Sequence, residues 1–157
     1  MKKINLKALI IGVVIPLAVG GLSALVTRGS MESFEMINKP PLSPPGILFP
    51  IVWTILYVLM GVASYFVYVS DTARGTKRVA LALYGLQLFF NFFWSVLFFN
   101  LEAYLAAFVW LVVLWILIVA TTFLFYAISK KAGYLMLPYI LWVSFAGYLN
   151  LAIYFLN

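Results

Sequence analysis

AYLAAFVWLVVLWILIVATTFLFYAI, residues 103–128, contains no Asp, Glu, Lys or Arg. At about 1.5 Å per residue, a helix over this stretch is long enough to cross the ~30 Å hydrocarbon core of a bilayer. Its apolar residues follow one another continuously, whereas the strands of an outer-membrane barrel alternate apolar and polar positions. Because lipid offers the backbone no hydrogen-bonding partner, only a helix satisfies such a segment. The stretch therefore predicts a membrane-spanning helix.

Four further stretches without charged residues predict four more spans. With the first stretch, they place the expected helices at residues 8–27, 47–69, 79–99, 103–128 and 134–156. The composition agrees, because 66% of the 157 residues are hydrophobic and 9% are charged, against about 45–50% and 25% in soluble domains. We therefore predict an all-α membrane protein, a five-transmembrane-helix bundle that forms a single domain over residues 1–157 in the lipid bilayer.

The first predicted span also has features of a secretory signal peptide. Met1-Lys2-Lys3 precedes an apolar run, and small residues follow at Gly21-Leu22-Ser23-Ala24, an arrangement typical of a cleavable leader. However, the apolar run continues to Val26, and four spans follow it. Cleavage stays an alternative, and we favour a retained first helix.

Charge is distributed unevenly between the connectors. With five spans, one side of the membrane receives eight basic residues, namely Lys2, Lys3, Lys7, Arg74, Lys77, Arg78, Lys130 and Lys131. The other side receives Arg28 and Lys39, accompanied by Glu32, Glu35 and Glu102. The positive-inside rule then places the N-terminus in the cytoplasm and the C-terminus outside. Because no basic stripe is long enough to follow nucleic-acid phosphates, we expect no nucleic-acid partner despite the net charge of +6.

The sequence lacks several residue types that chemistry in proteins often uses. It has no Cys and no His, which excludes disulfides, thiolate catalysis, most zinc and copper sites, and the usual axial ligands of haem. All four carboxylates lie in connectors, so no acid–base pair is expected at membrane depth. We therefore expect no catalytic residues, no metal site and no required cofactor.

The connector over residues 28–46 is the only long one. It contains a short amphipathic piece at residues 31–37, which Ser30 is expected to cap and whose first turn contains Glu32. Its prolines cannot continue a helix and stiffen the chain. The loop is therefore either a plain rigid connector or a lid over the mouth of the bundle, formed by Pro40, Pro41, Leu42, Pro44 and Pro45.

Three predicted spans each carry a stripe that mixes aromatic, small and hydrogen-bonding residues. Residues four positions apart share a helix face, and these stripes are Trp53, Tyr57 and Gly61; Gln87, Asn91 and Ser95, bordered by Trp94; and Trp142, Ala146 and Asn150, with Leu149 alongside. Such stripes suit a flat hydrophobic ligand held by stacking and a few polar contacts. Polar residues in spans also simply bond to neighbouring helices, so spacing alone leaves both interpretations open.

Three motifs, in order along the chain, resemble the signatures of the TspO/MBR family. They are KPPLSPPG with FPIVWTILY and Met60-Gly61 (residues 39–61), QLFFNFFWS with Phe98-Phe99 (87–99), and LPYILWVSFA with Leu149-Asn150 (137–150). This family comprises the translocator proteins, or peripheral-type benzodiazepine receptors, and the bacterial tryptophan-rich sensory proteins. The chain looks like a bacterial member, and the resemblance covers its whole length. It therefore implies that the protein lies in a bacterial cytoplasmic membrane.

The resemblance implies a function and a set of contact residues. Members of the family bind protoporphyrin IX or related tetrapyrroles and aromatic drug-like ligands, and they usually form homodimers. Transferred motif by motif, the residues expected to contact the ligand inside the bundle are Trp53, Tyr57, Asn91, Leu97, Trp142, Ala146 and Leu149. The leading expectation is a membrane sensor, scavenger or carrier of porphyrin-like molecules.

Other functions stay open beside it. Some bacterial members are reported to degrade porphyrin in light, which makes a light-dependent enzyme one alternative. A small-molecule transporter is another, although coupled transporters usually bury ionisable residues in their spans and these spans have none.

The chain departs from the family pattern at two positions. Leu42 stands where members commonly have Trp, and Trp110 stands where many have Asp. The first change removes a possible stacking partner in the loop, and the second removes a buried acceptor. Tyr154 is followed only by Phe155-Leu156-Asn157, so the basic residue of the sterol-binding pattern is absent and we expect no cholesterol binding through that element.

Overall fold

The computed structural model describes residues 3–157 as a bundle of helices. Its elements, in chain order, are α1 (Leu6–Thr27), the 3₁₀ turn η1 (Arg28–Ser30), α2 (Met31–Met36), α3 (Leu48–Tyr68), α4 (Arg74–Ser95), the π-helical turn η2 (Val96–Asn100), α5 (Tyr104–Ile128) and α6 (Lys130–Leu156). Within the described residues, five helices are long and apolar enough to cross a membrane, and no strand occurs. The predicted five-transmembrane-helix bundle is thus confirmed.

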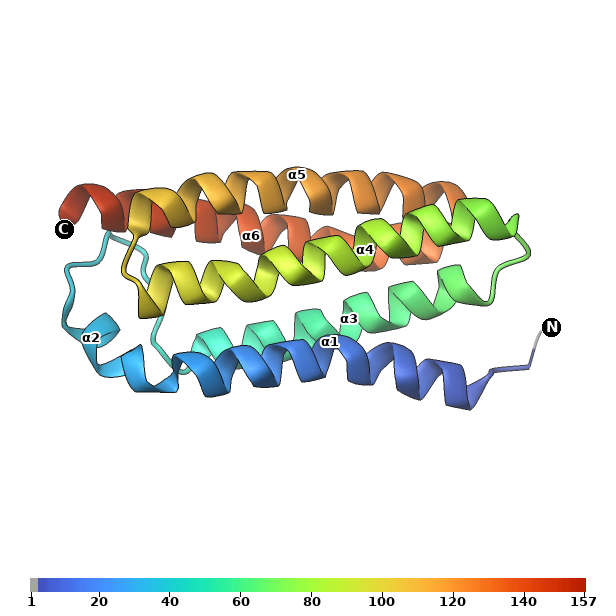
Figure 1. Cartoon of the computed structure of the whole chain (residues 1–157), viewed down its shortest axis with the longest axis horizontal. Helices are drawn as coiled ribbons and strands as arrows, with labels where there is room; N and C mark the ends of the chain where they lie inside the picture. Colours follow the sequence, from blue (N-terminus) through green and yellow to red (C-terminus); the bar gives the residue numbers. More distant parts are fainter. Residues whose placement is uncertain (1–2) are drawn as a thin grey trace.

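The five long helices lie side by side along the long axis of the molecule (Figure 1). The main helix pairs are α1 with α3, α3 with α6, α6 with α5, and α5 with α4, and α4 also contacts α1. The start of α1 lies at one end, which we call the basic end, and the C-terminus lies at the other with α2 and the long loop, which we call the loop end (Figure 1). This arrangement fits the predicted alternation of the connectors, although Lys2 lies outside the described residues.

Each long helix keeps large apolar side chains on its surface. Ile10, Ile55, Phe89, Phe123 and Leu141 are all at least half exposed. Contiguous apolar surface of this kind is unfavourable in water and is the normal lipid-facing surface of a membrane protein.

Two helices begin at least four residues earlier than the charge-free stretches predicted, and α1 begins two residues earlier, at Leu6. α4 begins at Arg74 rather than residue 79, and α6 begins at Lys130 rather than 134. Lys and Arg favour helix, and their long side chains reach toward the membrane surface, so a basic first turn extends a span. Ser129 also caps α6, because its side chain accepts a hydrogen bond from the Ala132 N–H.

The prediction that Ser30 caps the short helix is wrong. Its side chain makes no capping bond to α2; instead, the Ser30 hydroxyl donates to Asn100 Oδ1 at 2.7 Å. The Asn100 amide in turn donates to the carbonyl of Val26 at 3.1 Å. The Ser30 hydroxyl and Asn100 thus connect the end of η2 with the end of α1. Glu32 lies in the first turn of α2, as expected.

Glycines let α1 and α3 approach closely. A Cβ at Gly61 would lie 2.6 Å from the carbonyl oxygen of Gly12, and a Cβ at Gly20 would overlap the ring of Tyr57. These three glycines therefore serve packing within the chain. Gly61 belongs to this contact and not to a ligand-facing stripe with Trp53 and Tyr57.

Candidate ligand-binding site

An aromatic cluster lies between α3 and α6 and consists of Phe49, Trp53, Tyr57, Tyr139 and Trp142. The Trp53 ring stacks on Tyr57, with centroids 5.6 Å apart, and meets Tyr139 and Trp142 edge-on at 6.2 and 6.5 Å. Phe49 meets Trp142 edge-on at 5.9 Å. Aromatic pairs favour these edge-on and offset arrangements. The cluster thus brings together rings from the predicted second and fifth spans.

A buried polar network lies directly against this cluster. The Tyr57 hydroxyl donates to Asn91 Oδ1 at 2.9 Å, the Asn91 amide donates to the Tyr139 hydroxyl at 2.6 Å, and that hydroxyl donates to Gln87 Oε1 at 2.6 Å. Asn91 is 2% exposed and Gln87 is fully buried. Because both ends of its amide are already bonded, Asn91 holds the two tyrosines in place, and its direct contact with a ligand stays a prediction.

Two hydrogen-bond donors at this site are buried without a partner. They are the indole Nε1 of Trp142 and the amide Nε2 of Gln87. A buried donor that makes no hydrogen bond costs about 1–3 kcal/mol, and such groups are uncommon in folded proteins. A ligand with an acceptor group, such as a carboxylate or a carbonyl, would satisfy them.

The other indoles make different contacts. Trp94 Nε1 donates to Asn150 Oδ1 at 3.0 Å, and Trp115 Nε1 donates to the Ser144 hydroxyl at 2.9 Å. Trp110 donates to the carbonyl of Phe90 at 2.7 Å and stacks on the same residue at 4.2 Å. These three indoles connect neighbouring helices. Asn150 also donates to the carbonyl of Tyr104 at 2.8 Å, so it serves packing.

The remaining predicted contact residues are distributed more widely. Ala146 and Leu149 are buried on α6, with 8% and 6% of their surfaces exposed. Leu97 is half-buried in η2, which packs on α1, α4 and α5. Its role at the ligand site therefore stays a prediction.

Sequence reasoning did not assign Tyr139 and Phe49 to the site. Tyr139 is 1% exposed and lies in the middle of the polar network. Its spacing three residues before Trp142 places both on one face of α6, and this signal was present in the sequence. Phe49 lies at the start of α3, where an aromatic residue can equally be an interfacial anchor, so its position did not indicate a role at the site.

The long loop is fastened to α6 at the loop end. The Tyr148 hydroxyl donates to the carbonyl of Pro41 at 3.0 Å, and the side-chain amide of Asn157 donates to the carbonyl of Asn38 at 2.8 Å. Pro40 is buried, whereas Leu42 is 82% exposed and has a φ of 70°. That backbone conformation is costly for a residue with a Cβ.

The loop region also reaches the aromatic cluster. Phe34 of α2 meets the ring of Phe49 edge-on at 6.3 Å, and Phe49 in turn meets Trp142. Both predicted roles, a rigid connector and a lid, stay open, since these contacts fit either.

Residues 3–157 contain no group of three or more His, Cys, Asp or Glu side chains able to hold a metal ion. Four carboxylates are present, and all lie outside the five long helices. The site offers aromatic faces, two unpartnered donors and hydrogen-bonded tyrosine hydroxyls, which are groups of the kind that line ligand pockets.

Comparison with known proteins gives a consistent result. Residues 12–156 match the model of the TspO/MBR family. The tryptophan-rich protein TspO of Chlorobaculum tepidum is 39% identical over 99% of this chain and 98% of its own length, and that of Archaeoglobus fulgidus is 36% identical over 98% and 99%. The bovine translocator protein is 34% identical over 80% of this chain and 78% of its own length.

Proposed function

This chain belongs to the TspO/MBR family, and from that premise we propose that it binds a porphyrin-like tetrapyrrole in the aromatic cluster. The ligand class is protoporphyrin IX or a related flat aromatic molecule, and the protein acts as its membrane sensor, scavenger or carrier. The names of its relatives, tryptophan-rich sensory protein and translocator protein, fit this role. The chain is an integral membrane protein.

The observation that carries the proposal is the buried, unpartnered indole N–H of Trp142 beside the ring of Trp53. A tetrapyrrole offers a large π-face for stacking and carboxylate or carbonyl oxygens as acceptors. Stacking on an aromatic pair contributes about 0.5–1.5 kcal/mol beyond burial, and a bond to a charged acceptor contributes about 1.5–3 kcal/mol.

The proposed orientation follows the charges of the connectors. Seven basic residues among the described ones lie in or near the first turns of helices at the basic end, namely Lys3, Lys7, Arg74, Lys77, Arg78, Lys130 and Lys131. We place this end in the cytoplasm by the positive-inside rule. The loop end and the aromatic cluster then lie toward the outer side.

A homodimer is part of the proposal, on the basis of family resemblance. Gly12, Gly20 and Gly61 are used in packing α1 on α3 and are not free for a partner, whereas Gly85 on α4 has open space around it. Small residues allow close approach between membrane helices. Light scattering on the detergent-solubilised protein, corrected for bound detergent, distinguishes a mass of two chains from a mass of one.

Titration of the purified protein with protoporphyrin IX tests the binding function. The porphyrin absorbance band is followed in the dark, so that tryptophan variants are compared with one readout. We expect saturable binding, weakened about 10-fold by Trp142→Phe, since Phe keeps a ring but loses the donor. Trp115→Phe is the matched control, because the Trp115 N–H is bonded to Ser144, and it should leave the affinity unchanged.

The same titration under illumination separates the alternative. A new pigment that forms with the wild type and disappears in Trp142→Phe would indicate light-dependent degradation instead of binding alone. No saturable change in the porphyrin band, in the dark or in light, would contradict both functions.

A further inference from the structure

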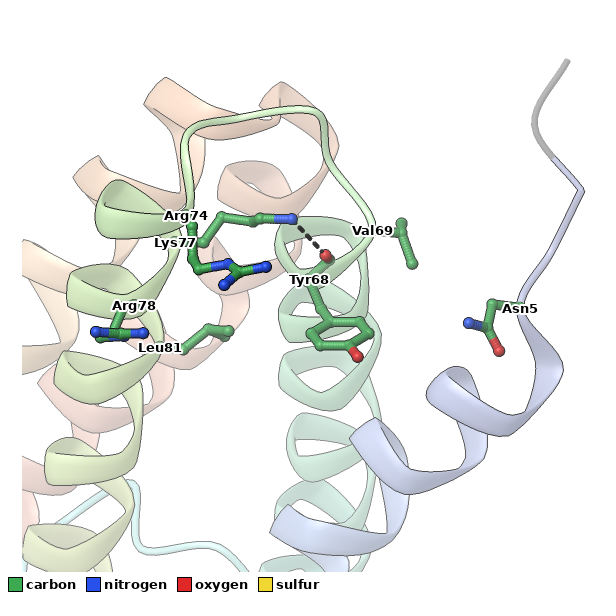
Figure 2. Close-up of a pocket in the computed structure, with 7 residues that line it drawn as sticks. All are labelled: Asn5, Tyr68, Val69, Arg74, Lys77, Arg78 and Leu81. Atoms are coloured by element: carbon green, nitrogen blue, oxygen red, sulfur yellow. Dashed lines mark hydrogen bonds between the residues drawn. The ribbon is translucent and has the colours of Figure 1, made fainter.

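A cavity lies at the basic end of the bundle, away from the aromatic cluster. Its volume is about 560 Å³, and it opens between α1, α3 and α4. Figure 2 shows the side chains that line it, namely Asn5, Tyr68, Val69, Arg74, Lys77, Arg78 and Leu81. Three of these seven are cations and none is a carboxylate, so the cavity has a positive lining.

The three cations have different structural roles. Lys77 Nζ donates to the carbonyls of Tyr68 and Ser70, each at 2.9 Å, and so closes the C-terminal end of α3. Arg74 and Arg78 are exposed, and neither guanidinium makes a hydrogen bond or an ion pair with another residue of the described chain. Residues four positions apart share a helix face, so both guanidinium groups remain available to one ligand on this side of α4.

The cavity lies at the depth where lipid headgroups meet the protein. Arg74 begins α4, while Leu81, in the cavity wall, and the exposed Val79 belong to the following apolar turns. Tyr68, 58% exposed, lies beside the cavity at the end of α3, the usual position of interfacial aromatic residues. In Figure 2, Arg74 and Lys77 extend from α4 toward Tyr68, and Asn5, which caps α1, lies on the other side of Tyr68.

This chemistry suits a phosphate that is attached to an apolar chain. Arg binds phosphate oxygens through two parallel N–H bonds, and basic pockets between membrane helices on the cytoplasmic side bind anionic headgroups. The apolar wall that continues from Leu81 and the exposed Ile4 and Leu6 of the α1 region provide surface for acyl chains. A free phosphate ion would use the cations but gain nothing from the apolar wall.

We propose that this cavity binds the phosphate of an anionic phospholipid through Arg74 and Arg78. The lipid belongs to the inner leaflet, and only this choice of leaflet rests on the proposed orientation. The site shares no residue with the aromatic cluster, so porphyrin binding and lipid binding succeed or fail independently.

Native mass spectrometry of the detergent-released protein tests the proposal, with phosphatidylglycerol and phosphatidylcholine added in equal amounts. The wild type should retain phosphatidylglycerol preferentially. The double variant Arg74→Gln with Arg78→Gln should retain it about 10-fold less, since charged hydrogen bonds are lost. The double variant Lys130→Gln with Lys131→Gln removes the same charge at the same end outside the cavity, and it should behave as the wild type.

Three results would overturn the site. If both double variants retain equally less phosphatidylglycerol than the wild type, the lipid is attracted to the basic end in general. If the wild type retains the two lipids equally, the cavity does not recognise the anionic headgroup. Displacement of phosphatidylglycerol by millimolar inorganic phosphate would assign the cavity to a free anion. Because Arg74 and Arg78 have no partner in the described chain, the variants should fold, and an unchanged melting temperature checks this.

Discussion

Two sets of tryptophans in this bundle differ in what their indole N–H groups do. Trp94, Trp110 and Trp115 donate to groups on neighbouring helices at 3.0, 2.7 and 2.9 Å. Trp142, in the aromatic cluster, buries its N–H without a partner. The same side chain is therefore a packing element in one region and an available donor in the other. The position of a tryptophan in a span does not decide its role; the availability of an acceptor on the adjacent helix does.

Trp94→Ala should produce the largest effect on stability. The ring is 8% exposed and stacks on Phe98 at 5.2 Å, and its N–H bonds Asn150. Removing a buried indole costs about 3–5 kcal/mol, which thermal unfolding in detergent measures. The protein that remains folded should bind porphyrin normally. Lost binding with an unchanged melting temperature would move Trp94 into the binding set.

Asn91→Leu should lower both stability and affinity, because Asn91 is buried and also orients two tyrosines of the aromatic cluster. The change leaves the hydroxyls of Tyr57 and Tyr139 with one partner fewer in a buried place, at a cost of about 1–3 kcal/mol. Affinity should fall because the tyrosines lose their orientation. Both quantities are measured on one sample by unfolding and by porphyrin titration.

Ser95→Ala serves as the control for that variant. Ser95 lies four residues later on the same helix and is half-buried, so its loss should change neither quantity. If Asn91→Leu weakens binding without any loss of stability, Asn91 contacts the ligand directly, as the family resemblance implies.

A pair of Trp→Phe changes tests the comparison most directly. Trp110→Phe removes the bond to the Phe90 carbonyl and should lower the stability of the ligand-free protein by about 1 kcal/mol. Trp142→Phe removes a donor that has no partner and should leave the stability unchanged or slightly higher. Chemical denaturation of both variants without ligand gives the answer. Equal losses would show that the Trp142 N–H is satisfied in the folded protein.

Leu42→Gly should have the smallest effect, and it should be stabilising. Leu42 has a φ of 70°, a conformation that destabilises the folded state by about 1–2 kcal/mol for a residue with a Cβ. Glycine removes this strain, but its more flexible unfolded chain lowers the stability by about 0.5–1 kcal/mol. A net gain below about 1 kcal/mol should appear as a small rise in melting temperature. Leu42→Ala keeps the Cβ and should give no gain, so equal melting temperatures for the two variants would contradict this explanation.

The sequence allowed the five spans to be predicted because continuous apolarity is a strong and local signal. It misplaced the starts of α4 and α6, since a basic first turn is helical yet interrupts a charge-free stretch. The π-helical turn η2 has no comparable signal. Spacing also placed Gln87 and Asn91 on one buried face, as the structure has them.

The contacts that a side chain makes with other helices were harder to predict than the helix face on which it lies. Spacing could not tell that Gly61 packs on Gly12 or that Asn150 bonds Trp94. A helical repeat defines which residues share a face, whereas the neighbour of that face depends on the order of helices in the bundle. For the same reason, the sequence did not reveal that the Ser30 hydroxyl donates to Asn100, seventy positions away, instead of capping α2.

The contact between Gly20 and Tyr57 has a consequence for engineering. No residue of α1 belongs to the aromatic cluster. The Tyr57 ring nevertheless occupies the space that a Gly20 side chain would fill, so α1 limits the position of this ring within the cluster. Enlarging residue 20 would push the ring inward and narrow the site from behind. A library that tests the proposed binding function should therefore vary position 20 together with the residues of the aromatic cluster.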